Sequence, residues 1–167
     1  MFPDMYFGEK TGAGEFPGTI IFSQRLMLDI LKEIDRICKK YDKIAVIEIK
    51  CDMTRCVEKL LETVEKHHSL EKSVFISFGW DNVVAVKKAR PEQKVQFLCC
   101  EWKEEYLERL IEHKIDLDIS QSAVTKELIE LLHQNGIEIN TWTVDSPETA
   151  KKFDDWGIDY ITSNILE

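Results

Sequence analysis

The sequence contains no long apolar run. No stretch of about 20 apolar residues could cross a bilayer, and no N-terminal segment resembles a signal peptide. Basic residues are fewer than acidic ones, 22 against 31, which gives a net charge of -9. This negative charge disfavours electrostatically driven binding to nucleic acid or to an anionic membrane surface. We therefore expect a cytoplasmic chain without a membrane span or a nucleic-acid partner, which holds any anionic ligand locally.

The chain has five cysteines and four histidines, and neither set matches a common metal or disulfide motif. The five cysteines form an odd set without a Cys-x-x-Cys pair, which predicts reduced thiols. A zinc site is a conceivable alternative, but the spacing of its four candidate ligands matches no common zinc module. Those candidates are Cys51, Cys56, His67 and His68. All four histidines, which include His113 and His133, lie near the predicted C-terminal ends of helices, where the helix dipole favours them and where a barrel has no active site. We interpret them as structural.

The length sets a second limit. A chain of 167 residues is enough for one domain but short of the roughly 250 residues of a complete eight-stranded α/β barrel. Four of the seven glycines lie in the first 20 residues, together with Pro3 and Pro17. This composition predicts a flexible lead-in over residues 1–20 and one folded domain over residues 21–167.

Helical and strand patterns alternate through that domain. Apolar residues at three- and four-residue steps predict helices over 23–40, 57–64, 83–88, 106–113 and 123–133, and Ser146-Pro147 opens another. Short β-branched runs predict six strands over 44–50, 74–78, 95–99, 115–119, 137–144 and 158–162. Such alternation implies parallel strands in either an open doubly wound sheet or a barrel. No dinucleotide glycine fingerprint follows any strand, which disfavours the first option.

Glu48 and Lys50 are the first candidate site residues. In a strand, Ile47 and Ile49 would face one side and Glu48 and Lys50 the other. The apolar pair should meet the helices, so the charged pair should face the lumen at the C-terminal end of the strand, where α/β barrels place their active sites. The structural alternative is a buried ion pair, either between Glu48 and Lys50 or with neighbouring residues.

Three further segments end predicted strands. Trp142, within Thr141 to Asp145, could wall a ligand pocket, although core packing is the commoner fate of a strand tryptophan. Ser77-Phe78 with Gly79-Trp80, and Thr162 to Asn164, are the other two. Each segment alone is a weak signal, so their order along the chain carries the information.

Several of these segments, taken together, resemble the glycerophosphodiester phosphodiesterase family. The matching segments, in order, are Ile47 to Lys50, Ile76 to Phe78, Pro91 before Val95 to Leu98, Leu132 to Gly136 before Ile139 to Val144, and Gly157 to Asn164. The resemblance implies a TIM-type barrel that hydrolyses glycerophosphodiesters to glycerol phosphate and an alcohol. It also implies that Glu48 is a ligand for Ca²⁺ or Mg²⁺, that Lys50 neutralises the phosphate, and that Trp142 and Phe78 border the substrate.

The sequence departs from the family pattern before Ser23. The family's first strands supply a His-Arg dipeptide, a Glu-x-Asp metal pair and a His-Asp dipeptide, and none of these precedes Ser23. A hard divalent cation takes about six oxygen ligands, so Glu48 alone should hold it weakly. The expected fold is therefore a partial (β/α) barrel of about six parallel strands that lacks the first ones, and the isolated chain should be incomplete or inactive.

Two functional hypotheses remain open, and an unrelated open α/β interaction domain is a third and weaker option. The first is a metal-dependent phosphodiester hydrolase whose N-terminal part is supplied elsewhere. The second is a non-catalytic remnant that binds a small phosphodiester or glycerol phosphate, or serves only as a scaffold. A partial barrel also leaves two unpaired edges and an exposed lumen. We expect a second copy of the chain, the lead-in or a complementing N-terminal segment to cover them.

Overall fold

The structure is a computed structural model that describes residues 5–7, 20–22 and 24–165, with side-chain surroundings from Leu31 onward. Six strands form one parallel sheet. They are β3 (Ala45–Glu48), β4 (Ser73–Ser77), β5 (Val95–Cys99), β6 (Asp116–Ser120), β7 (Ile139–Trp142) and β8 (Tyr160–Ile161). The expected strands are confirmed, although β7 and β8 are shorter than their apolar runs.

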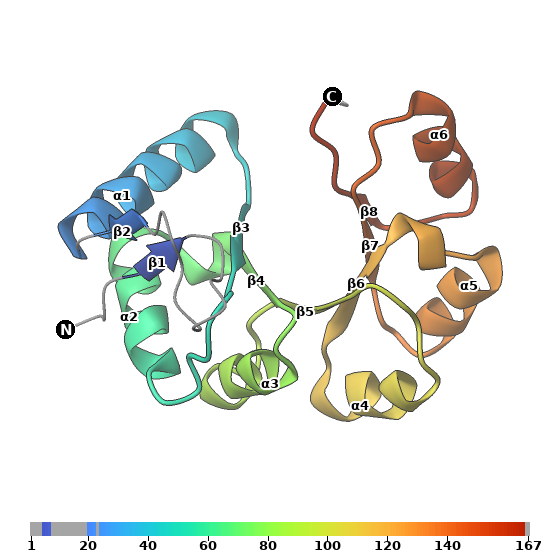
Figure 1. Ribbon diagram of the computed structural model, residues 1–167, viewed down its shortest axis with the longest axis horizontal. Coiled ribbons are helices and arrows are strands. Elements are labelled where there is room, and N and C mark those ends of the chain that lie inside the picture. Colours follow the sequence, from blue (N-terminus) through green and yellow to red (C-terminus); the bar gives the residue numbers. More distant parts are fainter. Residues whose placement is uncertain (1–4, 8–19, 23, 166–167) are drawn as a thin grey trace, which may run out of the picture.

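Helices connect the strands along one side of the sheet. They are α1 (Gln24–Tyr41), α2 (Val57–His67), α3 (Trp80–Ala89), α4 (Glu105–His113), α5 (Lys126–Gln134) and α6 (Pro147–Asp155), with short 3-10 turns η1 (Leu70–Lys72) and η2 (Gln121–Ala123). The sheet curls into an open half-barrel with the helices on its convex side (Figure 1). Strand order follows chain order throughout, without the reversal that marks a doubly wound sheet. The partial TIM-type barrel is therefore confirmed.

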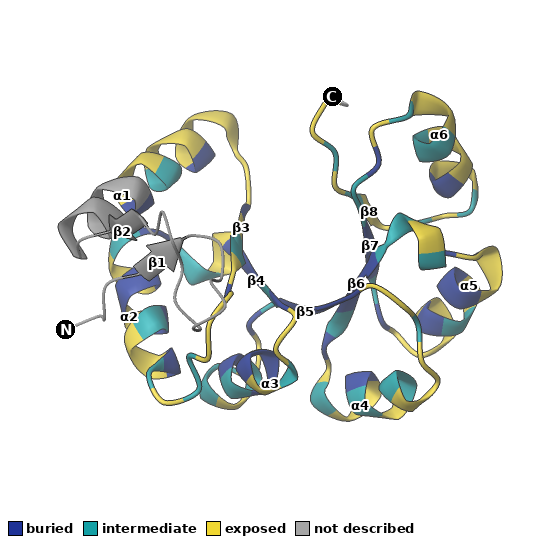
Figure 2. Ribbon diagram, viewed as in Figure 1, coloured by how far each residue is buried: buried dark blue, intermediate teal, exposed yellow. Residues whose placement is uncertain are grey.

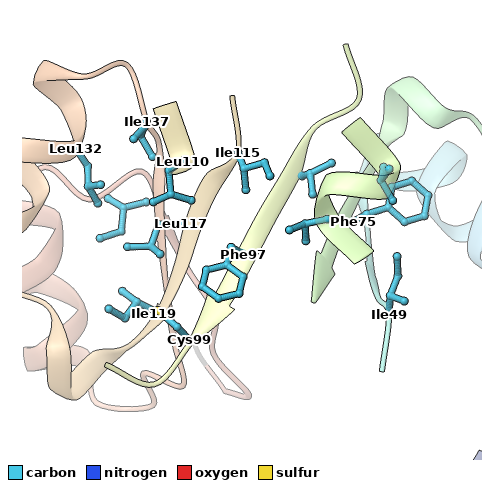
Figure 3. Packing of buried hydrophobic residues seen from close by; sticks show 14 of the residues in the cluster. Ile49, Phe75, Phe97, Cys99, Leu110, Ile115, Leu117, Ile119, Leu132 and Ile137 are labelled. Carbon is cyan, nitrogen blue, oxygen red and sulfur yellow. The ribbon is translucent and has the colours of Figure 1, made fainter. Parts of the chain in front are cut away.

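The core lies between the convex face of the sheet and the helices. Figure 2 shows buried residues running through the central strands, and Figure 3 shows Phe75, Phe97 and Leu117 among the apolar side chains packed there. Phe75 and Leu117 have no exposed surface. Burial of each such side chain stabilises the fold by about 1.5–3 kcal/mol.

Local capping chemistry sets the ends of two helices. Thr125 caps α5 by accepting a hydrogen bond from the Leu128 amide at 3.1 Å, so α5 begins at Lys126 and not at Ala123 as the apolar pattern suggested. Gly136 follows α5 with a φ of 71°, the left-handed conformation expected of it. Ser146 caps α6 and Pro147 occupies its first turn, as predicted.

The expected lead-in lies mostly outside the described residues. The structure describes one short strand within it, β1 (Met5–Phe7), which pairs in antiparallel fashion with β2 (Ile20–Phe22) across the predicted boundary. The domain boundary near residue 20 stays a prediction. In the described part of the chain, no helix has both the length and the apolar character needed to cross a membrane.

Candidate functional site

The concave face of the sheet encloses a pocket of about 640 Å³. All four predicted site residues line it: Glu48, Lys50, Phe78 and Trp142. They come from the ends of β3 and β4, which are neighbours at one edge of the sheet, and of β7, which lies near the other edge. A second hollow of about 580 Å³ at the ends of β3 and β4 shares Glu48, Lys50 and Phe78. The curvature of the sheet therefore gathers residues that are nearly 100 positions apart in the chain.

Side-chain alternation along β3 follows the sequence prediction. Ile49 is buried among the core residues and Ile47 packs against them, while Glu48 and Lys50 face the pocket. Lys50 Nζ lies 3.2 Å from Glu48 Oε2, and the two side chains are 67% and 31% exposed. The ion pair that we considered as the structural alternative is thus present but not buried. Because exposed pairs are held weakly, Lys50 can turn to an anionic ligand at little cost.

Phe78 and Trp142 form the aromatic wall of the pocket. Their ring centroids lie 5.9 Å apart at an interplanar angle of 81°, an edge-to-face contact. Phe78 is 52% exposed, and Trp142 is half-buried and outside the hydrophobic core. Core packing of Trp142 is therefore not what the structure shows. Its indole Nε1 is buried without a hydrogen-bond partner among the described residues.

Asn82, which the sequence did not single out, fixes the segment that follows Lys50. Its side chain donates to the Cys51 carbonyl at 2.9 Å and accepts from the Met53 amide at 2.9 Å. It also contacts Ser77 Oγ at 3.2 Å, and Ser77 donates to the Ile49 carbonyl at 2.6 Å. Gly79 must stay small here, since an added Cβ would lie 2.9 Å from Asn82 Nδ2. Ser77 and Asn82 are thus positioning residues behind the pocket.

The candidate segment Thr162 to Asn164 is mainly structural. The Asn164 amide and side chain both donate to Asp145, at 2.8 and 3.1 Å, and these bonds hold the pKa of Asp145 below its usual value. Thr162 lines the pocket and accepts a hydrogen bond from Asn140 Nδ2 at 2.9 Å. Only Thr162 of this segment borders the pocket.

Three polar residues on the pocket floor were missed. Gln96, Asp118 and Asn140 line the pocket from β5, β6 and β7, and all three are buried. Asn140 Nδ2 donates to Asp118 Oδ1 at 2.8 Å. Burial raises the pKa of Asp118 to about 6, against the hydrogen bond from Asn140, and the charge of Glu48 adds to the rise. These polar residues alternate with apolar neighbours inside the predicted strands, and that alternation could have indicated that they share one face of the sheet.

The histidines lie away from the pocket, as interpreted from the sequence. His68 is buried, with its ring nitrogens 3.1 Å from Asp35 Oδ1 and 3.1 Å from the Lys72 carbonyl. His133 Nε2 lies 2.8 Å from Asp159, and the ring of His113 contacts Trp80. Neither pocket has a histidine among its lining residues. Proton transfer in the pocket would have to use other groups.

The described residues do not by themselves form a metal centre. No cluster of three or more histidine, cysteine or acidic side chains suited to a metal ion occurs among them. Glu48 supplies one carboxylate, and Lys50 is paired with it. The zinc alternative fails on geometry, because Cys56 and His67 lie at opposite ends of the 11-residue helix α2, about 16 Å apart.

Comparisons with known proteins agree with this geometry. Residues 21–166 match the model of the glycerophosphoryl diester phosphodiesterase family. A glycerophosphodiester phosphodiesterase of Caldanaerobacter subterraneus is 26% identical over an alignment of 165 residues, and the match covers 96% of this chain and 63% of that protein.

Two solved structures share the fold. An Oleispira antarctica phosphodiesterase in complex with the product sn-glycerol-3-phosphate has a TM-score of 0.72 at 21% identity, over 80% of this chain and 56% of that one. A glycerophosphodiester phosphodiesterase from Parabacteroides distasonis has a TM-score of 0.67 at 22% identity, over 80% and 59%. The chain therefore spans less than two thirds of the length of each of these relatives.

Proposed function

Because the chain belongs to the glycerophosphoryl diester phosphodiesterase family, we propose that its concave pocket binds the phosphate of a glycerophosphodiester or of glycerol phosphate. The observation that carries this proposal is the shared pocket of Lys50, Phe78 and Trp142. Family membership also rules out the reading of the chain as an unrelated α/β interaction domain. The family reaction is the hydrolysis of glycerophosphodiesters to glycerol phosphate and an alcohol.

The proposed roles follow the chemistry of each side chain. Lys50, with its exposed ammonium group, contacts the phosphate oxygens. Phe78 and Trp142 border the carbon skeleton of the ligand and exclude water from one side. Glu48 serves as one oxygen contact for Ca²⁺ or Mg²⁺, and because the described residues do not complete such a site, we expect that contact to be weak.

We do not expect the 167-residue chain alone to catalyse this hydrolysis. Hydrolysis needs a proton donor for the leaving alkoxide and a base for the nucleophile, and neither pocket is lined by a histidine. We therefore propose a binding-competent but incomplete member of the family, and keep a purely structural remnant as the alternative. A cytoplasmic location and completion by a second copy or by an N-terminal segment remain sequence-based predictions.

Two measurements test this function. Calorimetry with glycerol phosphate should give binding to the wild-type chain that falls at least about tenfold in Lys50→Ala, the loss expected of a charge-assisted contact. A hydrolysis assay on glycerophosphodiesters with Mg²⁺ or Ca²⁺ should show no turnover above that of Glu48→Ala. Turnover that Glu48→Ala abolishes would show an active enzyme, while absence of any binding heat would leave only the scaffold.

A further inference from the structure

The two outer edges of the sheet carry most of the large apolar side chains that the described chain leaves exposed. β3 and β8 form these edges, on either side of the opening of the half-barrel (Figure 1). Six of the eight exposed large apolar residues belong to the two edges: Ile37, Tyr41, Ile44 and Val46 in or before β3, and Tyr160 and Ile165 in or after β8. Single exposed apolar residues are ordinary, but a group of them around one opening indicates a contact surface.

Helix α1 has a second apolar stripe beside the one that it buries. Leu31 and Cys38 lie two turns apart on the buried face. Ile37 and Tyr41 lie on another face of the helix, one turn apart, and are 41% and 56% exposed. Lys40 Nζ lies 4.7 Å from the centre of the Tyr41 ring, so a positive charge accompanies this stripe. A surface helix normally has one apolar face, so the second stripe of α1 indicates a further contact.

The main chain of both edges is open as well. The Ile49 amide donates to a carbonyl of β4 at 2.8 Å. Because alternate residues of a strand face opposite neighbours, the main-chain groups of Val46 and Glu48 point away from β4. The Thr162 amide donates to β7 at 2.8 Å, so the main-chain groups of Ile161 point away from β7 in the same way. No hydrogen bond between described residues reaches these outward groups, and such edges readily pair with another strand.

The two edges differ in the sign of their charge. Residues 31–100, which include β3, contain 14 basic and 11 acidic residues, whereas residues 101–167, which include β8, contain 6 and 16. Exposed residues of the same signs precede the two strands: Lys40 and Lys43 before β3, and Asp154 and Asp155 at the end of α6 before β8. Because a helix dipole disfavours carboxylates at the C-terminal end, a cation from outside would stabilise the end of α6.

A second copy of the chain matches both edges at once. A two-fold axis along the strands places β3 of each copy beside β8 of the other, which continues the parallel order of the sheet and leaves no edge open. Each junction then brings Lys40 and Lys43 near Asp154 and Asp155, because both pairs precede their strands. Pairing of β3 with β3 would be antiparallel and would bring like charges together.

We propose that the 167-residue chain forms a two-fold dimer in which β3 of one copy pairs with β8 of the other. The apolar residues of the two edges then pack across the junctions, and the opposite charges select β8 over a second β3 as the partner strand. Ile44 and Val46 line the concave pocket, so the partner copy also covers its open side. The dimer does not rest on the proposed phosphate site, since no step of the pairing uses a ligand.

Charge reversal at each edge tests the pairing by sedimentation equilibrium at low salt. Lys40→Glu with Lys43→Glu, and separately Asp154→Lys with Asp155→Lys, should each raise the dimer Kd at least about tenfold, because like charges then meet at both junctions. An equimolar mixture of the two double variants should return to within about threefold of the wild-type Kd, since opposite charges meet again at each junction. The matched control, Glu108→Lys with Glu112→Lys at exposed positions of α4, should change nothing.

Hydrogen exchange of the wild-type chain needs no variant. The amides of Val46, Glu48 and Ile161 should exchange at least about tenfold more slowly above the dimer Kd than below it, because they gain hydrogen bonds across the junctions. A monomeric wild-type chain, reversed variants that each associate like the wild type, a mixture that does not recover, or unprotected edge amides in the dimer would overturn the proposal. Glycerol phosphate binding by a monomeric chain would leave the proposed function standing.

Discussion

Two aspartates of the described chain show how surroundings set the charge of one side-chain type. Asp118 lies under the concave pocket, where burial raises its pKa from the ordinary 3.8 to about 6. Asp145 is not among the residues that line the pocket, and it accepts hydrogen bonds from Asn164 that lower its pKa. Burial disfavours the charged form and hydrogen bonds to a carboxylate favour it. The two residues should therefore influence the pH dependence of stability in opposite directions.

Asp118→Asn should stabilise the fold at alkaline pH. A carboxyl pKa that is raised on folding contributes stability below pH 4, and this contribution is lost as the pH rises through 6. The rise corresponds to about 3 kcal/mol. Asparagine keeps an acceptor for Asn140. At pH 8 the free energy of unfolding, measured by urea titration, should therefore be higher for the variant than for the wild type by up to that amount, with little difference at pH 4.

Asp145→Asn is the control of opposite sign. A lowered carboxyl pKa contributes stability above its unfolded value that is lost as the pH falls, so this variant should be less stable than the wild type at pH 8 and converge with it in acid. Urea unfolding curves for both variants at the two pH values make the comparison. If Asp118→Asn were no more stable than the wild type at pH 8, the carboxyl group would not be desolvated as described.

At the scale of elements, α3 holds the end of β3 through one side chain. Asn82 lies in the first turn of α3 and bonds the backbone of Cys51 and Met53, directly after Lys50. Asn82→Ala should lower the free energy of unfolding by about 1–3 kcal/mol, since it removes two part-buried hydrogen bonds to the backbone, each of which contributes about 0.5–1.5 kcal/mol. It should also weaken phosphate binding, because Lys50 would be held less firmly.

Hydrogen exchange at the Met53 amide reports this contact directly. Exchange should be faster in Asn82→Ala, whereas Asn82→Asp keeps an acceptor for Met53 and should retain more of the protection. Unchanged exchange in Asn82→Ala would show that α3 does not position the end of β3.

Regular elements were predictable because their signals are local. The alternation in β3, the left-handed Gly136 and the Ser146 cap each follow from a few neighbouring residues, and all were predicted. The start of α5 was misplaced, because apolar spacing extended past Thr125 while the hydrogen bond from the Leu128 amide decides the boundary. The role of Asn82 was not predicted, because its backbone partners lie 29 and 31 residues away in the sequence and no local pattern indicates them.

At the scale of the whole molecule, the curvature of the sheet explains what the sequence could and could not predict. The predicted site residues lie at the C-terminal ends of strands, and a barrel-like sheet brings these ends together. They are Glu48, Lys50, Phe78 and Trp142. The polar floor of Gln96, Asp118 and Asn140 depends on which face of each central strand is concave, a property of the assembled sheet. Runs that are buried on both faces give little indication of it.

The same curvature leaves surface that a closed barrel would cover. β3 and β8 are the outer strands of the sheet, on either side of its opening (Figure 1). Ile44, just before β3, and Val46, within β3, line the pocket yet are 56% and 62% exposed. Unpaired strand edges and exposed apolar side chains both favour association with another chain.

We therefore expect the 167-residue chain to self-associate through this opening, and Val46→Lys to shift it toward the monomer. A charge at Val46 would have to be desolvated in any contact that covers the concave face. Ile111→Lys is the matched control, because Ile111 is an exposed apolar residue of α4, on the helical side of the sheet. Sedimentation equilibrium over a dilution series separates the cases: a wild-type chain that stays monomeric, or equal association of both variants, would mean that the opening is not the contact surface.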